Sequence, residues 1–291
     1  MVIYLSKPII RMGDESDAHK IKNFASRLSM DGEISKNKWL NKINQNNIYP
    51  LIAIVDNDIV GKVQARIIEN IGWIESAKVD PKFRNQGIAN SLVMKAISWL
   101  ESQKVGQIRT MIDSDNLTAR LIIEKLNFKT IHVTINPLAE INEADSSNPE
   151  SNDLVSILDE ESYNDYYKLV RKYNNGNLMF DGKIIPFSKV IFSILVSENR
   201  IFTDNNYSSI LITSLHELPD EYYGCIISED YTGYKKLGLA LKSLAAREMA
   251  SHAICYSPAN KVAVKGLVSA DYYWNHPHTT LVYQKLNGEY L

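Results

Sequence analysis

The sequence lacks the features of a membrane protein and of a metal-binding protein. Its longest apolar stretches, such as residues 190–196, are far too short to cross a bilayer, and its N-terminal residues lack the pattern of a signal peptide. Cysteine is scarce: Cys225 and Cys255 are the two, and neither lies in a CxxC pair or a Cys/His cluster of metal-ligand spacing. We therefore expect a cytoplasmic protein with no membrane association and no metal site.

The chain also lacks a strong excess of charge. Its net charge is -2 at pH 7, whereas binding to nucleic acid phosphates needs a basic surface. Residues 1–141 carry 19 Lys and Arg against 15 Asp and Glu, and the remaining residues carry 13 against 19. The first half is the better place for an anionic ligand, although ordinary surface variation also explains this imbalance.

A polar segment divides the chain. Residues 142–153 read NEADSSNPESND and contain one apolar residue, Ala144, which is typical of a linker or an exposed loop. The length of 291 residues allows two domains of ordinary size. We predict a first domain over residues 1–141, a linker over 142–152 and a second domain over 153–291.

Hydrophobic periodicity predicts the order of elements in the first domain. The order is a strand at 2–5, helices at 14–28 and 35–43, strands at 49–55, 59–69 and 72–79, a helix at 86–100, a strand at 107–112, a helix at 116–126 and a strand at 128–135. This order predicts an α/β fold whose mixed, mostly antiparallel sheet is flanked by helices, with a parallel pair around the crossover helix.

The most informative segment, residues 72–92, runs from a strand through a loop into a helix. Gly87, at the start of the helix, lets an anion approach the backbone, and the free N–H groups and the helix dipole there favour a pyrophosphate. Arg84 adds a cationic donor, and Ala89 is small enough for close approach. The alternative explanation is a plain helix start with a solvated arginine.

This loop resembles the acetyl-CoA signature of the GNAT superfamily of N-acetyltransferases. The signature reads Arg or Gln, two residues, Gly, one residue, then Gly or Ala, and residues 84–89 read Arg-Asn-Gln-Gly-Ile-Ala. Val79 and Pro81 match the Val-x-Pro segment that commonly precedes the signature. The resemblance, which covers residues 49–133 well, implies a GNAT-like fold.

A second match lies further along the chain. Asn116, Ala119 and Phe128 match a later Asn-x-x-Ala pattern and the aromatic residue that follows its helix. Capping of that helix is an equally good explanation of Asn116, and it is compatible with a contact to CoA.

The resemblance implies acetyl-CoA as cosubstrate and a primary amine as acceptor, either a small molecule or a protein amine. The residues that it places against acetyl-CoA are Ala77, Lys78, Val79, Arg84, Asn85, Gln86, Gly87, Ile88, Ala89, Asn90 and Asn116. Two other classes of function stay open: a module that binds acetyl-CoA without turnover, and a scaffold that presents a protein interface. The oligomeric state does not follow from the sequence.

The family also implies where catalysis takes place. In GNAT enzymes the thioester carbonyl lies in a gap between two parallel strands, against a backbone N–H of the strand before the loop, here from residues 77–79. The attacking amine must lose a proton, and Glu75 on the same strand is the candidate base, directly or through water. Period-two alternation predicts Trp73, Glu75, Ala77 and Val79 on one face. The alternative for Glu75 is an ordinary solvent-facing residue on a half-exposed strand.

One position departs from the family. A tyrosine on the last helix often protonates the leaving thiolate, but Ile123 occupies that position here. Water or a nearby hydroxyl such as Ser114 can replace it, or the domain binds CoA and catalyses poorly. We expect the acceptor to enter between the N-terminal helices and the end of the sheet, where residues 30–38 form a polar loop.

The second half resembles a divergent copy of the first. We predict strands at 154–158 and 223–227 and helices at 160–173 and 234–249. Residues 235–240 read Lys-Lys-Leu-Gly-Leu-Ala, like the binding loop with Lys in place of Arg, while Asn260, Ala263 and Tyr272 repeat the later pattern. Coincidence on an apolar helix is the alternative. The His-Pro-His at 276–278 is typical of a hairpin turn.

Overall fold

The computed structural model confirms the expected fold class, because mixed, mostly antiparallel strands are flanked by helices. It describes residues 7–28, 35–147, 154–157, 159–204, 208–214, 220–274 and 279–286. The strand expected at 2–5, most of the polar loop at 30–38 and the turn at 276–278 lie outside these residues. The chain forms two compact units, which we call unit 1 (Met1–Ile112, Leu117–Ile131 and Tyr283–Leu291) and unit 2 (Asp113–Asn116 and His132–Val282).

Unit 1 is built mainly from the first part of the chain and follows the predicted order from α1 onward, whereas β1 at residues 9–12 was not predicted. Its elements are β1 (Ile9–Met12), α1 (Ala18–Arg27), α2 (Lys36–Ile43), β2 (Ile48–Val55), β3 (Asp58–Ile68), β4 (Ile71–Val79), α3 (Ile88–Ser102), β5 (Gln107–Asp113) and α4 (Leu117–Lys125). β1 to β4 pair antiparallel in that order. Asp56 and Asn57 form the tight β2–β3 turn with φ of 47° and 68°, a backbone conformation that Asp and Asn tolerate better than most side chains.

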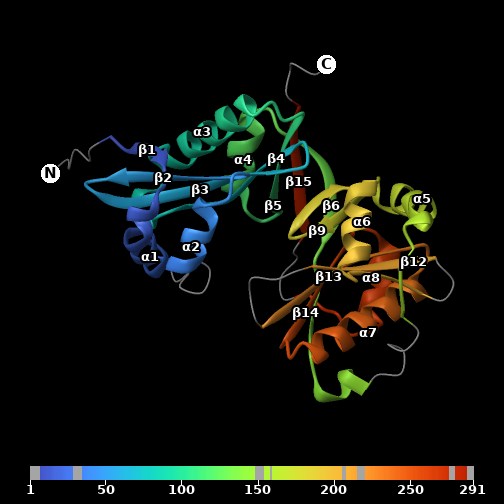
Figure 1. Cartoon of the computed structure of the whole chain (residues 1–291). Helices are drawn as coiled ribbons and strands as arrows, with labels where there is room; N and C mark the ends of the chain where they lie inside the picture. Colours follow the sequence, from blue (N-terminus) through green and yellow to red (C-terminus); the bar gives the residue numbers. More distant parts are fainter. Residues whose placement is uncertain are drawn as a thin grey trace. The chain divides into compact units, whose positions relative to one another are not determined.

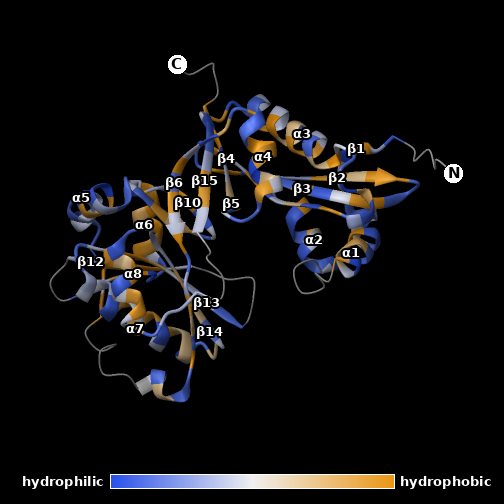
Figure 2. Cartoon of the chain, turned by 180° about the vertical axis from the view of Figure 1, so that it is seen from behind, coloured by the Kyte–Doolittle hydropathy of each residue, from blue (hydrophilic) through white to orange (hydrophobic). Residues whose placement is uncertain are grey.

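Helices cover both faces of the sheet in unit 1. α1 and α2 lie on one face of β2 and β3, and α3 lies on the other (Figure 1). The sequence of β2, IYPLIAIV, is hydrophobic along most of its length because both of its faces are covered (Figure 2). On the α1 side the core cluster comprises Ala18, Ile21, Phe24, Ala25, Trp39, Ile52 and Ile59.

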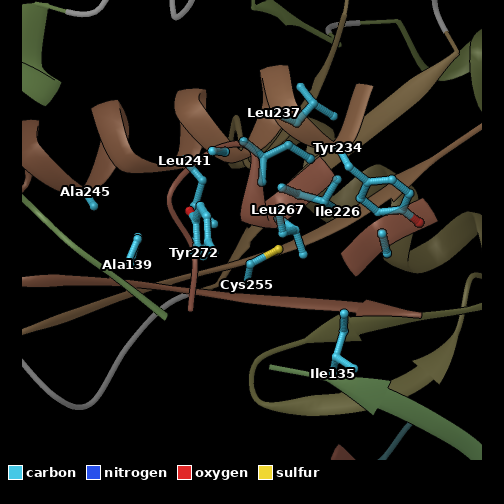
Figure 3. Packing of buried hydrophobic residues seen from close by; sticks show 14 of the residues in the cluster. Ile135, Ala139, Ile226, Tyr234, Leu237, Leu241, Ala245, Cys255, Leu267 and Tyr272 are labelled. Carbon is cyan, nitrogen blue, oxygen red and sulfur yellow. The ribbon is translucent and has the colours of Figure 1, made fainter. Parts of the chain in front are cut away.

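Unit 2 has its own core, centred on the long helix α7. Its elements are β6 (Lys129–Ile135) from His132 onward, β7 (Leu138–Glu140), β8 (Val155–Ser156), α5 (Tyr163–Asn174), β9 (Asn177–Phe180), β10 (Lys183–Pro186), α6 (Lys189–Ser197), β11 (Ile201–Thr203), β12 (Ser209–Ser214), β13 (Glu221–Ser228), α7 (Tyr231–Arg247), β14 (His252–Pro258), α8 (Lys261–Val268) and the first half of β15 (Thr279–Leu286). Leu241 and Ala245 point from α7 toward the strands, with Tyr272 beside Leu241 (Figure 3). A buried ion pair joins this helix to the segment after β7, with Lys242 Nζ 3.2 Å from Asp145 Oδ1.

The compact units are not contiguous in sequence. Residues 132–141 belong to unit 2, and Tyr283–Leu291, at the end of the chain, belong to unit 1. In the strand order, β15 lies next to β5. Lys285 Nζ of β15 lies 3.3 Å from Glu101 Oε1, and Gln284 Oε1 accepts a hydrogen bond from Arg109 Nε at 3.1 Å. The domain boundaries at residues 141 and 153 stay a prediction, but the end of the chain completes unit 1.

Both cysteine thiols are buried in unit 2. Cys225 and Cys255 are at most 1% exposed, and burial raises the pKa of Cys225 to about 12 and the pKa of Cys255 as well. Because the thiolate is the reactive form, we expect the native protein to give no reaction with a thiol reagent at about pH 8, and two equivalents after denaturation. Rapid labelling of the native protein would contradict this burial.

No helix in the described ranges is long and apolar enough to span a membrane. The same ranges contain no group of three or more His, Cys, Asp and Glu side chains arranged to hold a metal ion.

Candidate active site

β4 and β5 separate after a short parallel stretch. Their register runs from Ile71 opposite Gln107 to Trp73 opposite Arg109, although β4 continues to Val79 and β5 to Asp113. The backbone N–H and C=O groups on this edge of β4 beyond Trp73 therefore do not pair with β5. This is the kind of gap that the resemblance implied, since unpaired backbone groups there can bind an extended ligand.

A bulge interrupts β4 at Ser76. Glu75 pairs with Gln64, and Lys78 pairs with Lys62, so one residue of β3 lies opposite two residues of β4. Ser76 has a φ of 55°, as expected for the extra residue. Because residues 62 and 64 share a face, Glu75 shares its face with Lys78. The expectation that Ala77 and Val79 lie on the face of Glu75 is wrong, since strict alternation does not survive an extra residue.

The loop after β4 is anchored by a buried carboxylate. Asp80 is 4% exposed, its Oδ1 accepts from the backbone N–H of Lys82, and its Oδ2 lies 2.9 Å from Arg27 Nε. Arg27 also donates to the carbonyl of Ile59 at 2.6 Å. The Val-x-Pro segment thus fixes the loop to α1 and β3 through its middle residue, a role that the sequence pattern did not reveal.

α3 begins at Ile88, directly after a glycine that no L-residue replaces without strain. Gly87 has a φ of 78° and no side-chain cap, and a Cβ built on it would meet no atom within 4 Å. The first N–H groups of an α-helix have no carbonyl acceptor within the helix, and here they border open space. This cradle fits a phosphate group of CoA.

The other predicted contacts are distributed around this cradle. Arg84, Asn85, Gln86 and Asn90 are exposed, Ala89 is half-buried, and Ile88 packs into the core. On β4, Ala77 and Lys78 are exposed and Val79 is half-buried. Arg84 turns back, so that its Nε donates to the carbonyl of Val79 at 3.3 Å.

Glu75 is held by a buried amide. Gln64 is 6% exposed, and its Nε2 donates to Glu75 Oε1. Both side chains lie on the face of the sheet that carries α1 and α2. Gln64 pairs with Glu75 on β4 and with Pro50 on β2, and Pro50 and Gln64 line a hollow together with Trp39 of α2. The carboxylate is thus half-buried and fixed in direction, unlike a freely solvated surface residue.

The end of the site near α4 differs from the family pattern. Asn116 directly precedes α4, and Ile123 is 4% exposed in the core. Sequence reasoning missed Tyr283, whose hydroxyl donates to Glu124 Oε1 at 2.7 Å and accepts from Arg120 Nε at 3.3 Å. No sequence signal connects residues so far apart in the chain.

The proposed repeat of the binding loop in unit 2 is wrong. Residues 235–240 lie inside α7, and Gly238 is buried rather than at a helix start. The true start carries Asp230, whose Oδ1 accepts from Gly233 N at 2.9 Å and so puts a carboxylate where a phosphate would bind. Asn260 likewise caps α8 by accepting from Ala263 N at 2.9 Å. Residues 235–240 match the signature in residue type, but they lie within an apolar helix and not in a loop before one.

A mixed sheet with two parallel strands that separate beside an uncapped helix N-terminus is the arrangement that the GNAT resemblance implied. Residues 19–128 match the family described as "Acetyltransferase (GNAT) family". This part of the chain is thus similar to a family that uses acetyl-CoA.

Other proteins are similar over different lengths. The chain is 31% identical over 90 residues to "Acetyltransferase ECA0875" of Pectobacterium atrosepticum, and the match covers 31% of this chain and 64% of that relative, less than two thirds of its length. A putative acetyltransferase from Thermoplasma acidophilum is 14% identical with a TM-score of 0.64, and the match covers 96% of this chain and 99% of that one.

A tandem GNAT protein from the clavulanic acid biosynthesis pathway is 9% identical, with a TM-score of 0.59 over 97% of this chain and 99% of that one. At these sequence identities, the structural similarity shows a shared fold and nothing more. The whole chain therefore has the fold of tandem GNAT proteins, as the resemblance of the second half implied.

Proposed function

We propose that unit 1 catalyses the transfer of an acetyl group from acetyl-CoA to a primary amine. The observation that carries the proposal is the combination, in one unit, of the gap between β4 and β5 with the uncapped start of α3 at Gly87. Backbone donors at both places suit a long ligand with a pyrophosphate at one end. Acetyl-CoA supplies the activated acetyl group.

In this proposal, the loop and the start of α3 hold the phosphates. Backbone N–H groups from residues 85–90 donate to phosphate oxygens, while the Arg84 side chain adds positive charge at the loop. A backbone N–H from residues 77–79 that faces the gap donates to the thioester carbonyl, whose oxygen gains negative charge during attack. Asn116 contributes at the start of α4.

Glu75 removes the proton from the attacking amine, directly or through one water. The Gln64 amide donates to one carboxylate oxygen and so fixes the direction of the carboxylate, which as an ionised group can accept the proton of the amine. Ile123 has no proton to give, so water or a hydroxyl such as Ser114 protonates the leaving thiolate. The amine leaves with the acetyl group, and CoA leaves as the thiol.

The same isoleucine favours a second candidate, a protein that binds acetyl-CoA without turning it over. The two candidates differ in one observable. Incubation with acetyl-CoA and a panel of primary amines, followed with a thiol reagent, should show release of CoA that depends on both the protein and the amine. Binding of acetyl-CoA without release for any amine, including protein N-termini and lysine peptides, would favour the second candidate.

A further inference from the structure

Lys78 is an exposed lysine on β4, three residues after the proposed base. Among the residues that the structure describes, no side chain forms an ion pair or a hydrogen bond with its ammonium group. Its neighbours Ala77 and Val79 belong to the part of β4 that lies beyond its pairing with β5. A primary amine of the protein therefore lies at the place where we propose that the thioester binds.

The bulge at Ser76 determines which face of the sheet carries this amine. In a regular strand, residues 75 and 78 would point to opposite faces. Here Glu75 pairs with Gln64. Lys78 pairs with Lys62, which lies two residues before Gln64 on β3 and so shares its face. The extra residue in β4 thus places Lys78 on the face of Glu75.

This face is the one that carries α1 and α2. The opposite face of β3 packs against α3, because a Cβ added to Gly61 would lie 3.1 Å from the side chain of Leu92. Lys62 follows Gly61 in the strand and therefore points away from α3. Lys78 and Glu75 thus lie together on the side of the sheet from which we expect an acceptor amine to enter.

We propose that Lys78 is a site of self-acetylation, at which its amino group attacks the acetyl group of the acetyl-CoA bound to the same chain. An N–C bond forms at Lys78 Nζ, and the C–S bond of the thioester breaks. The ammonium group gives up two protons: Glu75 takes one and passes it to water, and the other reaches the thiolate through water. The products are acetyl-lysine and CoA. This inference rests on the proposed function, since it uses the same donor and the same base.

The position of the side chain favours this reaction over one between two molecules. Lysine carries its amine on a flexible stem of four carbons, which allows the amine to turn from the face of the sheet toward the adjacent gap. A nucleophile held beside the reacting carbonyl has a high effective concentration. Lys62 lies on the same face but on β3, one strand further from the gap, so we expect it to react more slowly.

The test is incubation of the full chain with acetyl-CoA and no added amine, followed by digestion and mass spectrometry. We expect acetylation of Lys78 to be at least about 100-fold faster than that of Lys82 and Lys95, two exposed lysines of the same unit. The rate per molecule should not change when the protein is diluted, because donor and amine belong to one chain. A rate that rises with protein concentration would overturn a step within one chain.

Three variants separate catalysis at this site from uncatalysed acetylation. Lys78→Arg keeps the positive charge and should lose the modification. Glu75→Gln should slow acetylation at residue 78 by about 100-fold. The Arg84→Glu, Gly87→Asp double variant should prevent it, because the donor no longer binds. Uncatalysed acetylation at Lys95 should stay the same in each variant.

This inference and the proposed function fail in different ways. Turnover of added amines with Lys78 left unmodified, or equal labelling of Lys78 and Lys95, would overturn this inference alone. Binding of acetyl-CoA with neither turnover of any amine nor acetylation of Lys78 would overturn the proposed function and this inference with it.

Discussion

Replacement of Glu75 by Gln lowers kcat/KM for the acceptor amine by about 100- to 10,000-fold in our account, the range expected for loss of a general base. Glutamine keeps the oxygen that accepts the hydrogen bond from Gln64, so the local packing is preserved while the basic oxygen is lost. Binding of acetyl-CoA should stay the same, since Glu75 does not belong to the phosphate cradle.

The pH profile separates a base from a positioning residue. In the native protein kcat/KM should fall with falling pH as the carboxylate becomes protonated, and the variant should lose this acidic limb. Glu69→Gln, on the exposed β3–β4 turn, removes a carboxylate of the same unit as a control. If Glu75→Gln keeps activity within about threefold, Glu75 is a structural residue and positioning alone drives the reaction.

Replacement of Asp145 by Ala should destabilise unit 2 by about 3–5 kcal/mol, because it leaves a buried ammonium group without its carboxylate. The Lys242 side chain is 6% exposed and Asp145 is 11% exposed. Asp145 Oδ2 also accepts from the backbone N–H of Asn142 at 2.8 Å, so the substitution frees that end of the segment as well. Urea unfolding at neutral pH measures the change.

Two further variants test the physical reason. Asp271→Asn removes an 84% exposed carboxylate that lies 4.0 Å from the same ammonium group, and it should change stability by less than about 1 kcal/mol. Asparagine tolerates the φ of 62° at this position. Adding Lys242→Met to Asp145→Ala removes the unpaired charge and should recover much of the loss. A double variant no more stable than Asp145→Ala alone would contradict this explanation.

The loop before α3 could be predicted from the sequence because its conformational requirements are local. Gly87 must have a positive φ and Pro81 begins a turn, and both constraints are visible in consecutive residues. The strands around it were predicted for the same reason, since alternating and continuous apolar runs reflect burial directly.

What could not be predicted depends on register or on contacts distant in sequence. The bulge at Ser76 leaves no mark in the pattern of apolar residues, yet it changes which side chains share a face with Glu75. The contacts of Tyr283 with α4 link residues that only the folded chain brings together. Residues 235–240 illustrate a different error. Their residue types match the loop signature, but α7 begins before them, at Tyr231.

Acetyl-CoA binding to the start of α3 is the central claim, and calorimetric titration of acetyl-CoA into the intact chain tests it most directly. We expect one site per chain, because Asp230 occupies the corresponding helix start in unit 2. The Arg84→Glu, Gly87→Asp double variant should abolish binding, since it places two carboxylates at the cradle and strains a backbone with a φ of 78°. No binding to the intact chain, or unchanged binding to the variant, would contradict the account.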